Sequence, residues 1–137
     1  MKILLSLQPH QKIGKWWLNK SSRLQKSSRN KIDKYISNGN VIWISAVTMW
    51  EIFLLVKKNK IDLKMSTQDW ITKIEKLSFV SFVPMENRIA HEAVNLPGKF
   101  HKDPADRFIV ATARLLEIPL ITADKKILDY EHVKTIW

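Results

Sequence analysis

Short apolar runs alternate along this chain with longer segments whose apolar residues recur at helical spacing, and this alternation restricts the possible folds most strongly. Runs of three to five residues have the length of strands, and VIWI at 41–44 is rich in the β-branched residues typical of buried parallel strands. The predicted strands cover 2–5, 41–44, 79–83, 120–122 and 133–137. The predicted helices cover 21–38, 46–58, 67–77, 86–95, 103–117 and 125–130.

Strands that alternate with helices are typical of a parallel sheet, because each parallel connection must cross a face of the sheet. We therefore expect an α/β fold, a three-layer α/β/α sandwich with a mostly parallel central sheet. The 137 residues are enough for one hydrophobic core and contain no low-complexity linker, which predicts a single domain over 1–137. Functional sites in such sheets form beyond the carboxyl ends of the strands.

The chain is strongly basic, with a net charge of +10 and eight lysines and arginines before its first acidic residue, Asp33. This charge favours an anionic partner, nucleic acid first, although a solvated basic helix explains it equally well. The absence of cysteine excludes disulfides and thiolate zinc sites and fits a cytoplasmic location. No apolar run reaches the ~20 residues that span a bilayer, so we expect no membrane segment. We expect no signal peptide either, because no sustained apolar core follows Lys2.

Three carboxylates occupy positions that a parallel sheet brings to one edge. Glu51 lies in the apolar helix after the second strand, Asp106 opens the helix before the fourth strand, and Asp124 follows that strand. A charge such as that of Glu51 is costly to bury unless it is paired or bound to a metal. Clustered carboxylates repel one another unless a cation or protons intervene, and their oxygens suit hard cations such as Mg²⁺ or Mn²⁺. The sequence therefore predicts a divalent-cation site made of these three acids.

Each acid also has a structural explanation. Asp103 is a suitable N-cap with Pro104 in the first helical position, and Asp106 can then close a capping box. Asp124 can cap the helix that follows it, and Glu51 can face a solvent-filled slot. These alternatives remain open at the level of the sequence.

The chain resembles PIN domains, specifically VapC-type toxins of bacterial type II toxin–antitoxin systems. The resemblance rests on SAVTMWEI (45–52), HKDPADRFIVATA (101–113), LITAD (120–124) and WWLNKSSRLQKSSRNKI (16–32). It implies a Mg²⁺- or Mn²⁺-dependent endoribonuclease that cleaves structured RNA, forms a homodimer and is neutralised by a cognate antitoxin. Glu51, Asp106 and Asp124 match the second, third and fourth acids of the family, and so the resemblance assigns them as catalytic and metal-binding residues.

Several other residues are expected near these acids. Asp103 is best explained as the cap that orients Asp106, and Ser45 or Thr122 can position a ligand or a water molecule. The basic residues of the motif are candidates for phosphate contact, although for each an exposed, solvated side chain is the stronger prediction; they are His101, Lys102 and Arg107. Six tryptophans are many for this length, and any exposed member of the set Trp16, Trp17 and Trp50 would mark a dimer interface or an antitoxin groove.

The first acid of the family pattern is missing. It normally closes the first strand, but here Leu5 is followed by Ser6, and the segment 6–15 has neither strand alternation nor a helical stripe. A pair of frameshifts or a sequence error, a genuine loss of activity, or a substitute ligand such as Ser6 or His10 would each explain this anomalous segment. Because one carboxylate fewer weakens cation binding, we expect cleavage by this chain to be slight or absent.

Two other functions compete with a nuclease. The alternative is a non-catalytic RNA- or antitoxin-binding PIN-fold remnant that kept the basic surface and lost the chemistry. A basic DNA-binding protein ranks lowest, because the sequence contains no convincing helix-turn-helix or zinc pattern.

Overall fold

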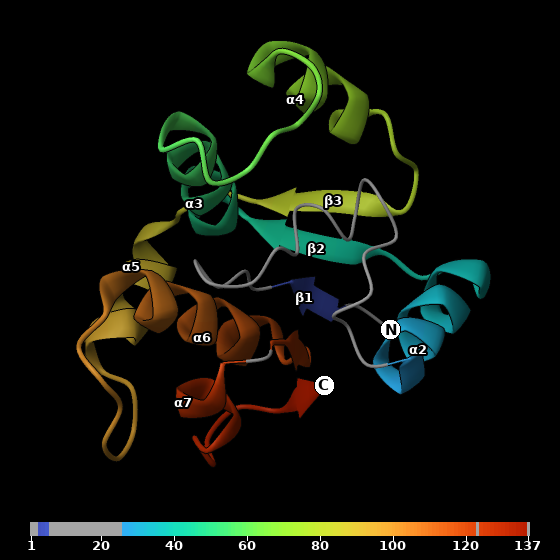
Figure 1. Cartoon of the computed structure of the whole chain (residues 1–137). Helices are drawn as coiled ribbons and strands as arrows, with labels where there is room; N and C mark the ends of the chain where they lie inside the picture. The colour runs from blue at the N-terminus through green and yellow to red at the C-terminus, as the bar shows by residue number, and fades with distance from the viewer. Residues whose placement is uncertain (1–2, 6–25, 123, 137) are drawn as a thin grey trace.

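One parallel sheet forms the centre of the molecule (Figure 1). The structure is a computed structural model that describes residues 3–5, 26–122 and 124–136. Its strands follow the order β3-β2-β1-β4-β5, and every neighbouring pair is parallel. Leu4 of β1 pairs with Trp43 of β2 and with Leu120 of β4, which places β1 in the middle. The strands are β1 (Ile3–Leu5), β2 (Ile42–Ser45), β3 (Val80–Val83), β4 (Leu120–Ile121) and β5 (Thr135–Ile136).

Helices cover both faces of this sheet (Figure 1). One face carries α2 (Lys26–Ser37), α3 (Ala46–Lys57) and α4 (Thr67–Glu75), and the other carries α5 (Asn87–Val94), α6 (Pro104–Leu116) and α7 (Lys125–Leu128). Successive side chains of a strand point to opposite faces of the sheet. Ile121 therefore packs into the core beneath α2, α3 and α4, called the first core, and Leu120 packs into the second core, beneath α5, α6 and α7. The predicted three-layer α/β/α architecture is confirmed, and all the described strands are parallel.

Capping residues set the starts of the helices as the sequence predicts. The Ser45 hydroxyl accepts a hydrogen bond from the Val47 N–H at 3.1 Å and so begins α3 directly after β2. Asp103 caps α6, and Pro104 occupies its first turn. The ends of the helices differ more from the predicted bounds than their starts do. Helix α4, predicted to reach residue 77, stops at Glu75, because the N–H of Leu77 donates to the Ile74 carbonyl at 3.0 Å. The first residues of the helix predicted at 21–38 lie outside the described residues.

The sheet edge at the carboxyl ends of the strands positions the candidate site. Strand β2 leads at this edge into α3, and β4 leads into the turn before α7. Helix α6 is anchored by its central residues Ile109, Val110 and Ala111, which are fully buried in the second core. No helix within the described residues is long and apolar enough to cross a membrane.

Candidate active site

A pocket of about 490 Å³ gathers the three predicted acids, although they come from three different elements. Glu51 lines it from α3, Asp106 from the first turn of α6, and Asp124 from the turn after β4. The other lining residues are apolar (Trp50, Leu54, Leu55 and Ala105), acidic (Asp103) or basic (Lys58, His101 and Lys126). The sequence prediction that Glu51, Asp106 and Asp124 meet at one edge of the fold therefore agrees with the structure.

Glu51 is held in this pocket by an otherwise apolar helix. Its neighbours Ile52 and Leu55 are buried in the core, and Glu51 itself is only 9% exposed. Burial, followed by the negative charges of Asp106 and Asp103, raises the pKa of Glu51 to about 8. Without an added cation, the Glu51 carboxyl therefore keeps its proton at neutral pH.

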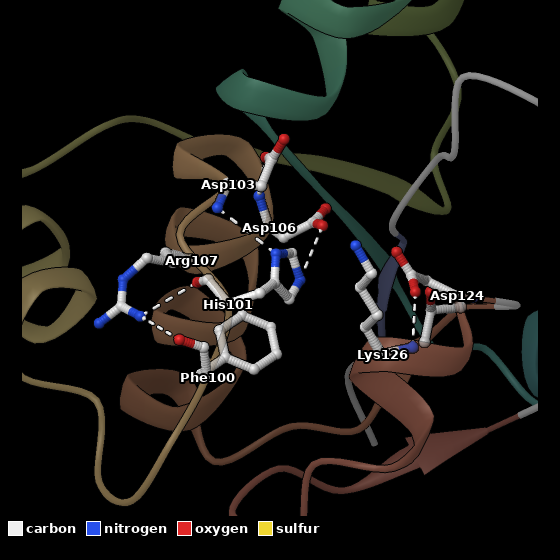
Figure 2. A network of polar contacts seen from close by, with 8 residues as sticks. Phe100, His101, Asp103, Asp106, Arg107, Asp124 and Lys126 are labelled. Carbon is white, nitrogen blue, oxygen red and sulfur yellow. Dashed lines mark hydrogen bonds and ion pairs between the residues drawn. The ribbon is translucent and has the colours of Figure 1, made fainter.

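Asp106 lies at the centre of a short polar network (Figure 2). Its Oδ2 atom is 3.1 Å from Nε2 of His101, a contact at ion-pair distance that lacks the alignment of a well-formed hydrogen bond. The backbone N–H of Asp106 donates to Oδ1 of Asp103 at 3.1 Å, which is the N-cap contact of α6. The N–H of Asp103, which a capping box would direct to Asp106, donates to Nδ1 of His101 at 3.4 Å. The cap of α6 is therefore Asp103, as predicted, while the Asp106 side chain lines the pocket.

Asp124 caps a helix and also lines the pocket. Its Oδ1 atom accepts a hydrogen bond from the Lys126 N–H at 2.7 Å, so Asp124 is the N-cap of α7. Its own N–H donates to the buried Thr122 hydroxyl at 3.1 Å, which fixes the turn. Figure 2 shows the Lys126 side chain extending between Asp124 and the His101 ring. This pocket wall therefore offers one carboxylate and one ammonium group.

Arg107 differs from its prediction as a solvated or phosphate-binding side chain. Its guanidinium donates to the Ala93 carbonyl at 2.8 Å and to the Phe100 and His101 carbonyls at 3.1 and 3.2 Å. A fourth bond reaches the Val94 carbonyl at 3.3 Å. Figure 2 shows the guanidinium pointing away from Asp106. Arg107 therefore fixes the loop before α6, and the sequence contains no signal for this role because all four acceptors are backbone atoms.

The remaining predicted residues lie at the rim or outside the described part. Lys102 is exposed, and Ser45 is engaged in capping α3. Trp50 is 56% exposed and lines the pocket, and its role at a dimer interface or an antitoxin groove stays a prediction. Ser6, His10, Trp16 and Trp17 lie outside the described residues.

The donor set suits a hard divalent cation, but it is not a preformed cage. Carboxylate oxygens are the ligands that Mg²⁺ and Mn²⁺ prefer. Burial and the neighbouring negative charges of Asp106 and Asp103 raise the pKa of Glu51, and a bound cation would lower it. Within the described ranges, no three His, Cys, Asp or Glu side chains have the arrangement of a metal site. The assignment of Glu51, Asp106 and Asp124 as metal ligands therefore remains a prediction.

Comparison with known proteins agrees with this architecture. The chain is 27% identical over 128 residues to Ribonuclease VapC22 of Mycobacterium tuberculosis, which covers 91% of this chain and 93% of the relative. Among solved structures, VapBC2 from Rickettsia felis bound to a promoter DNA fragment matches with a TM-score of 0.69 and 19% identity, over 100% of this chain and 99% of that one.

Two further solved structures share the fold. A toxin–antitoxin complex from Klebsiella pneumoniae matches with a TM-score of 0.64 and 20% identity, over 98% of this chain and 96% of that one. DNA-bound VapBC from Salmonella typhimurium matches with a TM-score of 0.65 and 14% identity, over 99% and 97%. The family profile described as PIN domain matches residues 16–133. The profile covers most of the sequence, and the chain therefore belongs to the PIN domain family.

Proposed function

We propose that this chain is a VapC-like toxin, an endoribonuclease that cleaves structured RNA with Mg²⁺ or Mn²⁺ and is neutralised by a cognate antitoxin. The observation that carries the proposal is the common pocket of Glu51, Asp106 and Asp124 at the carboxyl edge of the sheet. The relative named Ribonuclease VapC22 and the VapBC complexes of the same fold support it. The net charge of +10 suits a polyanionic substrate.

In this proposal Glu51, Asp106 and Asp124 hold the divalent cation. When bound, the cation supplies an activated water molecule and stabilises the charge that develops during in-line displacement at a phosphodiester. The carboxylates orient the groups around the reacting phosphate. Lys58 and Lys126, which line the same pocket, attract the RNA backbone and offset its repulsion by the acids.

The sequence also bears on the rate that this chain can reach. No acidic residue precedes Asp33, so β1 does not supply the carboxylate that the family places after this strand. We expect weak cation binding and slow cleavage for this reason.

A cleavage assay with matched variants tests the proposal. The purified chain is incubated with structured RNA in Mg²⁺, in Mn²⁺ or in excess chelator. We expect cleavage only with a cation, and loss of cleavage in Glu51→Gln and Asp106→Asn. Asp62→Asn is the matched control, because Asp62 is an exposed acid paired with Lys64 and does not line the pocket. Cleavage that persists in chelator or in both site variants would contradict the proposal.

The runner-up function is an RNA- or antitoxin-binding module without catalysis. The missing acid before Asp33 favours it. Such a module would bind RNA or the antitoxin equally well as wild type and as Glu51→Gln, and it would cleave nothing under any metal condition.

The proposal of a VapC-like toxin also includes a homodimer and a cytoplasmic location. Light scattering of the purified chain at increasing concentration tests whether the homodimer forms.

A further inference from the structure

His101 lies between two acidic residues and contacts each of them through a different nitrogen atom (Figure 2). Nδ1 accepts the backbone N–H of Asp103 at 3.4 Å, and Nε2 lies 3.1 Å from Oδ2 of Asp106. Because Nδ1 is used as an acceptor, the proton of a neutral ring must be on Nε2, facing Asp106. The contacts therefore select one tautomer of His101.

The contact between Nε2 of His101 and Oδ2 of Asp106 is largely shielded from solvent. The His101 and Asp106 side chains are only 21% and 13% exposed, and Nε2 itself is shielded from solvent without a well-formed hydrogen bond to any described residue. A buried N–H without an acceptor is destabilising. Oδ2 of Asp106 is the acceptor within reach, and so the imidazole and the carboxylate restrict each other's orientation.

The backbone of His101 is fixed as well. The Arg107 guanidinium binds the carbonyl oxygen of His101 at 3.2 Å, and it also binds the carbonyls of Phe100 and Ala93. The Phe100 ring packs against the imidazole with a centroid distance of 4.4 Å and against Tyr130 at 4.6 Å. The imidazole is therefore held from its backbone and from one side of its ring.

We propose that His101 is a positioning residue, whose Nε2–H sets the orientation of the Asp106 carboxylate in the pocket while Asp103 and Arg107 set the orientation of His101. The inference rests on the proposed function, since it matters only if Asp106 binds a cation. Groups that hold a ligand in this way typically contribute 10–100-fold to metal affinity. His101 does not touch the reacting atoms in this arrangement, and its effect passes through Asp106.

Mn²⁺ binding without RNA gives a readout that is independent of cleavage. Electron paramagnetic resonance titration at pH 8 compares wild type, His101→Leu and His101→Gln, and unfolding in chelator reports the stability of each protein. We expect His101→Leu to bind Mn²⁺ at least about tenfold more weakly. His101→Gln keeps an N–H donor at the end of the side chain, and we expect it to recover most of the lost affinity.

His132 provides a matched control. It is another partly buried histidine beside an acid, with Nε2 3.4 Å from Glu131 and its ring 5.3 Å from Tyr130, but it does not line the acid pocket. We expect His132→Leu to leave Mn²⁺ affinity unchanged. Equal Mn²⁺ affinity in His101→Leu and wild type would overturn the inference and leave the proposed function intact. A wild-type chain that binds no Mn²⁺ would overturn both.

The ring tautomer provides a second measurement if His101→Leu does not fold. Nitrogen-15 spectra of the labelled wild-type chain at pH 8 distinguish the two neutral tautomers, and His101→Gln identifies the signal of His101 by its absence. We expect the proton on Nε2 and an unprotonated Nδ1. A proton on Nδ1 would contradict the geometry on which the inference depends.

Discussion

Glu51 of α3 and Asp106 of α6 line the same pocket, and the negative charge of Asp106 adds to the effect of burial in raising the pKa of Glu51 to about 8. The pocket therefore contains more acid than it keeps ionised at neutral pH by itself. A divalent cation or a basic group from a partner would change this balance, because either would stabilise the charged form of Glu51.

Stability in chelator should fall with rising pH through the titration of Glu51. Below pH 4.5, the ordinary pKa of this carboxyl, Glu51 is protonated in both the folded and the unfolded chain. Between 4.5 and about 8 the unfolded chain releases the proton and the folded chain retains it, so the free energy of unfolding decreases. Glu51→Gln lacks this loss. We expect the melting temperature of Glu51→Gln minus that of wild type to increase from pH 5 to pH 8, and this difference to be smaller in Mg²⁺. A difference in melting temperature that stays constant with pH would contradict the raised pKa of Glu51.

Two substitutions at Asp124 should separate its capping role from its charge. Asparagine caps a helix about as well as aspartate, whereas alanine removes the acceptor for the Lys126 N–H. We expect Asp124→Ala to lower the free energy of unfolding by about 1 kcal/mol and Asp124→Asn to lower it little. Both variants should lose metal-dependent cleavage. Retained cleavage in Asp124→Asn would show that the carboxylate serves only as a cap.

The sequence predicts the fold because its signals are local. The alternation of apolar runs with amphipathic segments gives the layers, and single residues such as Ser45 and Asp103 give the starts of helices. The position of Glu51 and Asp124 on one pocket also follows, since the carboxyl ends of all parallel strands in a sheet share one edge.

The contacts around Asp106 depend instead on tertiary structure. The Arg107 hydrogen bonds go to the carbonyls of a loop and of the end of α5, and no sequence pattern identifies a backbone acceptor. The approach of His101 to Asp106 depends on the path of that same loop. The extension of the Lys126 side chain toward the acids depends on its place in the first turn of α7, which Asp124 caps.

Removal of the Arg107 guanidinium should destabilise the loop before α6. Arg107→Met keeps the length of the side chain but leaves the carbonyls of Ala93, Val94, Phe100 and His101 without their shared donor. We expect the free energy of unfolding, measured in urea, to fall by about 2–4 kcal/mol. Arg88→Met is the control, because Arg88 is exposed on α5. Equal stability of the two variants would contradict the role of Arg107 in fixing this loop.

Lys126 should contribute to RNA affinity through its charge. It lines the pocket beside Asp124, where an ammonium group can meet a phosphate. In a Glu51→Gln background with chelator, we expect Lys126→Met to weaken RNA binding and to reduce the slope of log affinity against log salt by about 1. Lys73→Met removes the same charge from α4, outside the pocket, and we expect a smaller effect. Equal salt slopes in Lys126→Met and in the background protein would exclude a phosphate contact at Lys126.

Restoring a carboxylate after β1 should raise metal-dependent cleavage. Strand β1 ends at Leu5 between β2 and β4, and the segments that follow those two neighbours carry Glu51 and Asp124. Because all three strands are parallel, β1 ends at the same edge of the sheet as β2 and β4. We expect Ser6→Asp, with or without shortening of the segment 6–15, to bind Mg²⁺ more tightly and to cleave RNA faster, since a further carboxylate oxygen completes the donor set. Ser6→Asn introduces a side chain of nearly the same shape as aspartate but without the charge. Its cleavage rate and Mg²⁺ affinity are the reference for those of Ser6→Asp. If Ser6→Asp performs no better than Ser6→Asn, the missing acid does not limit this site.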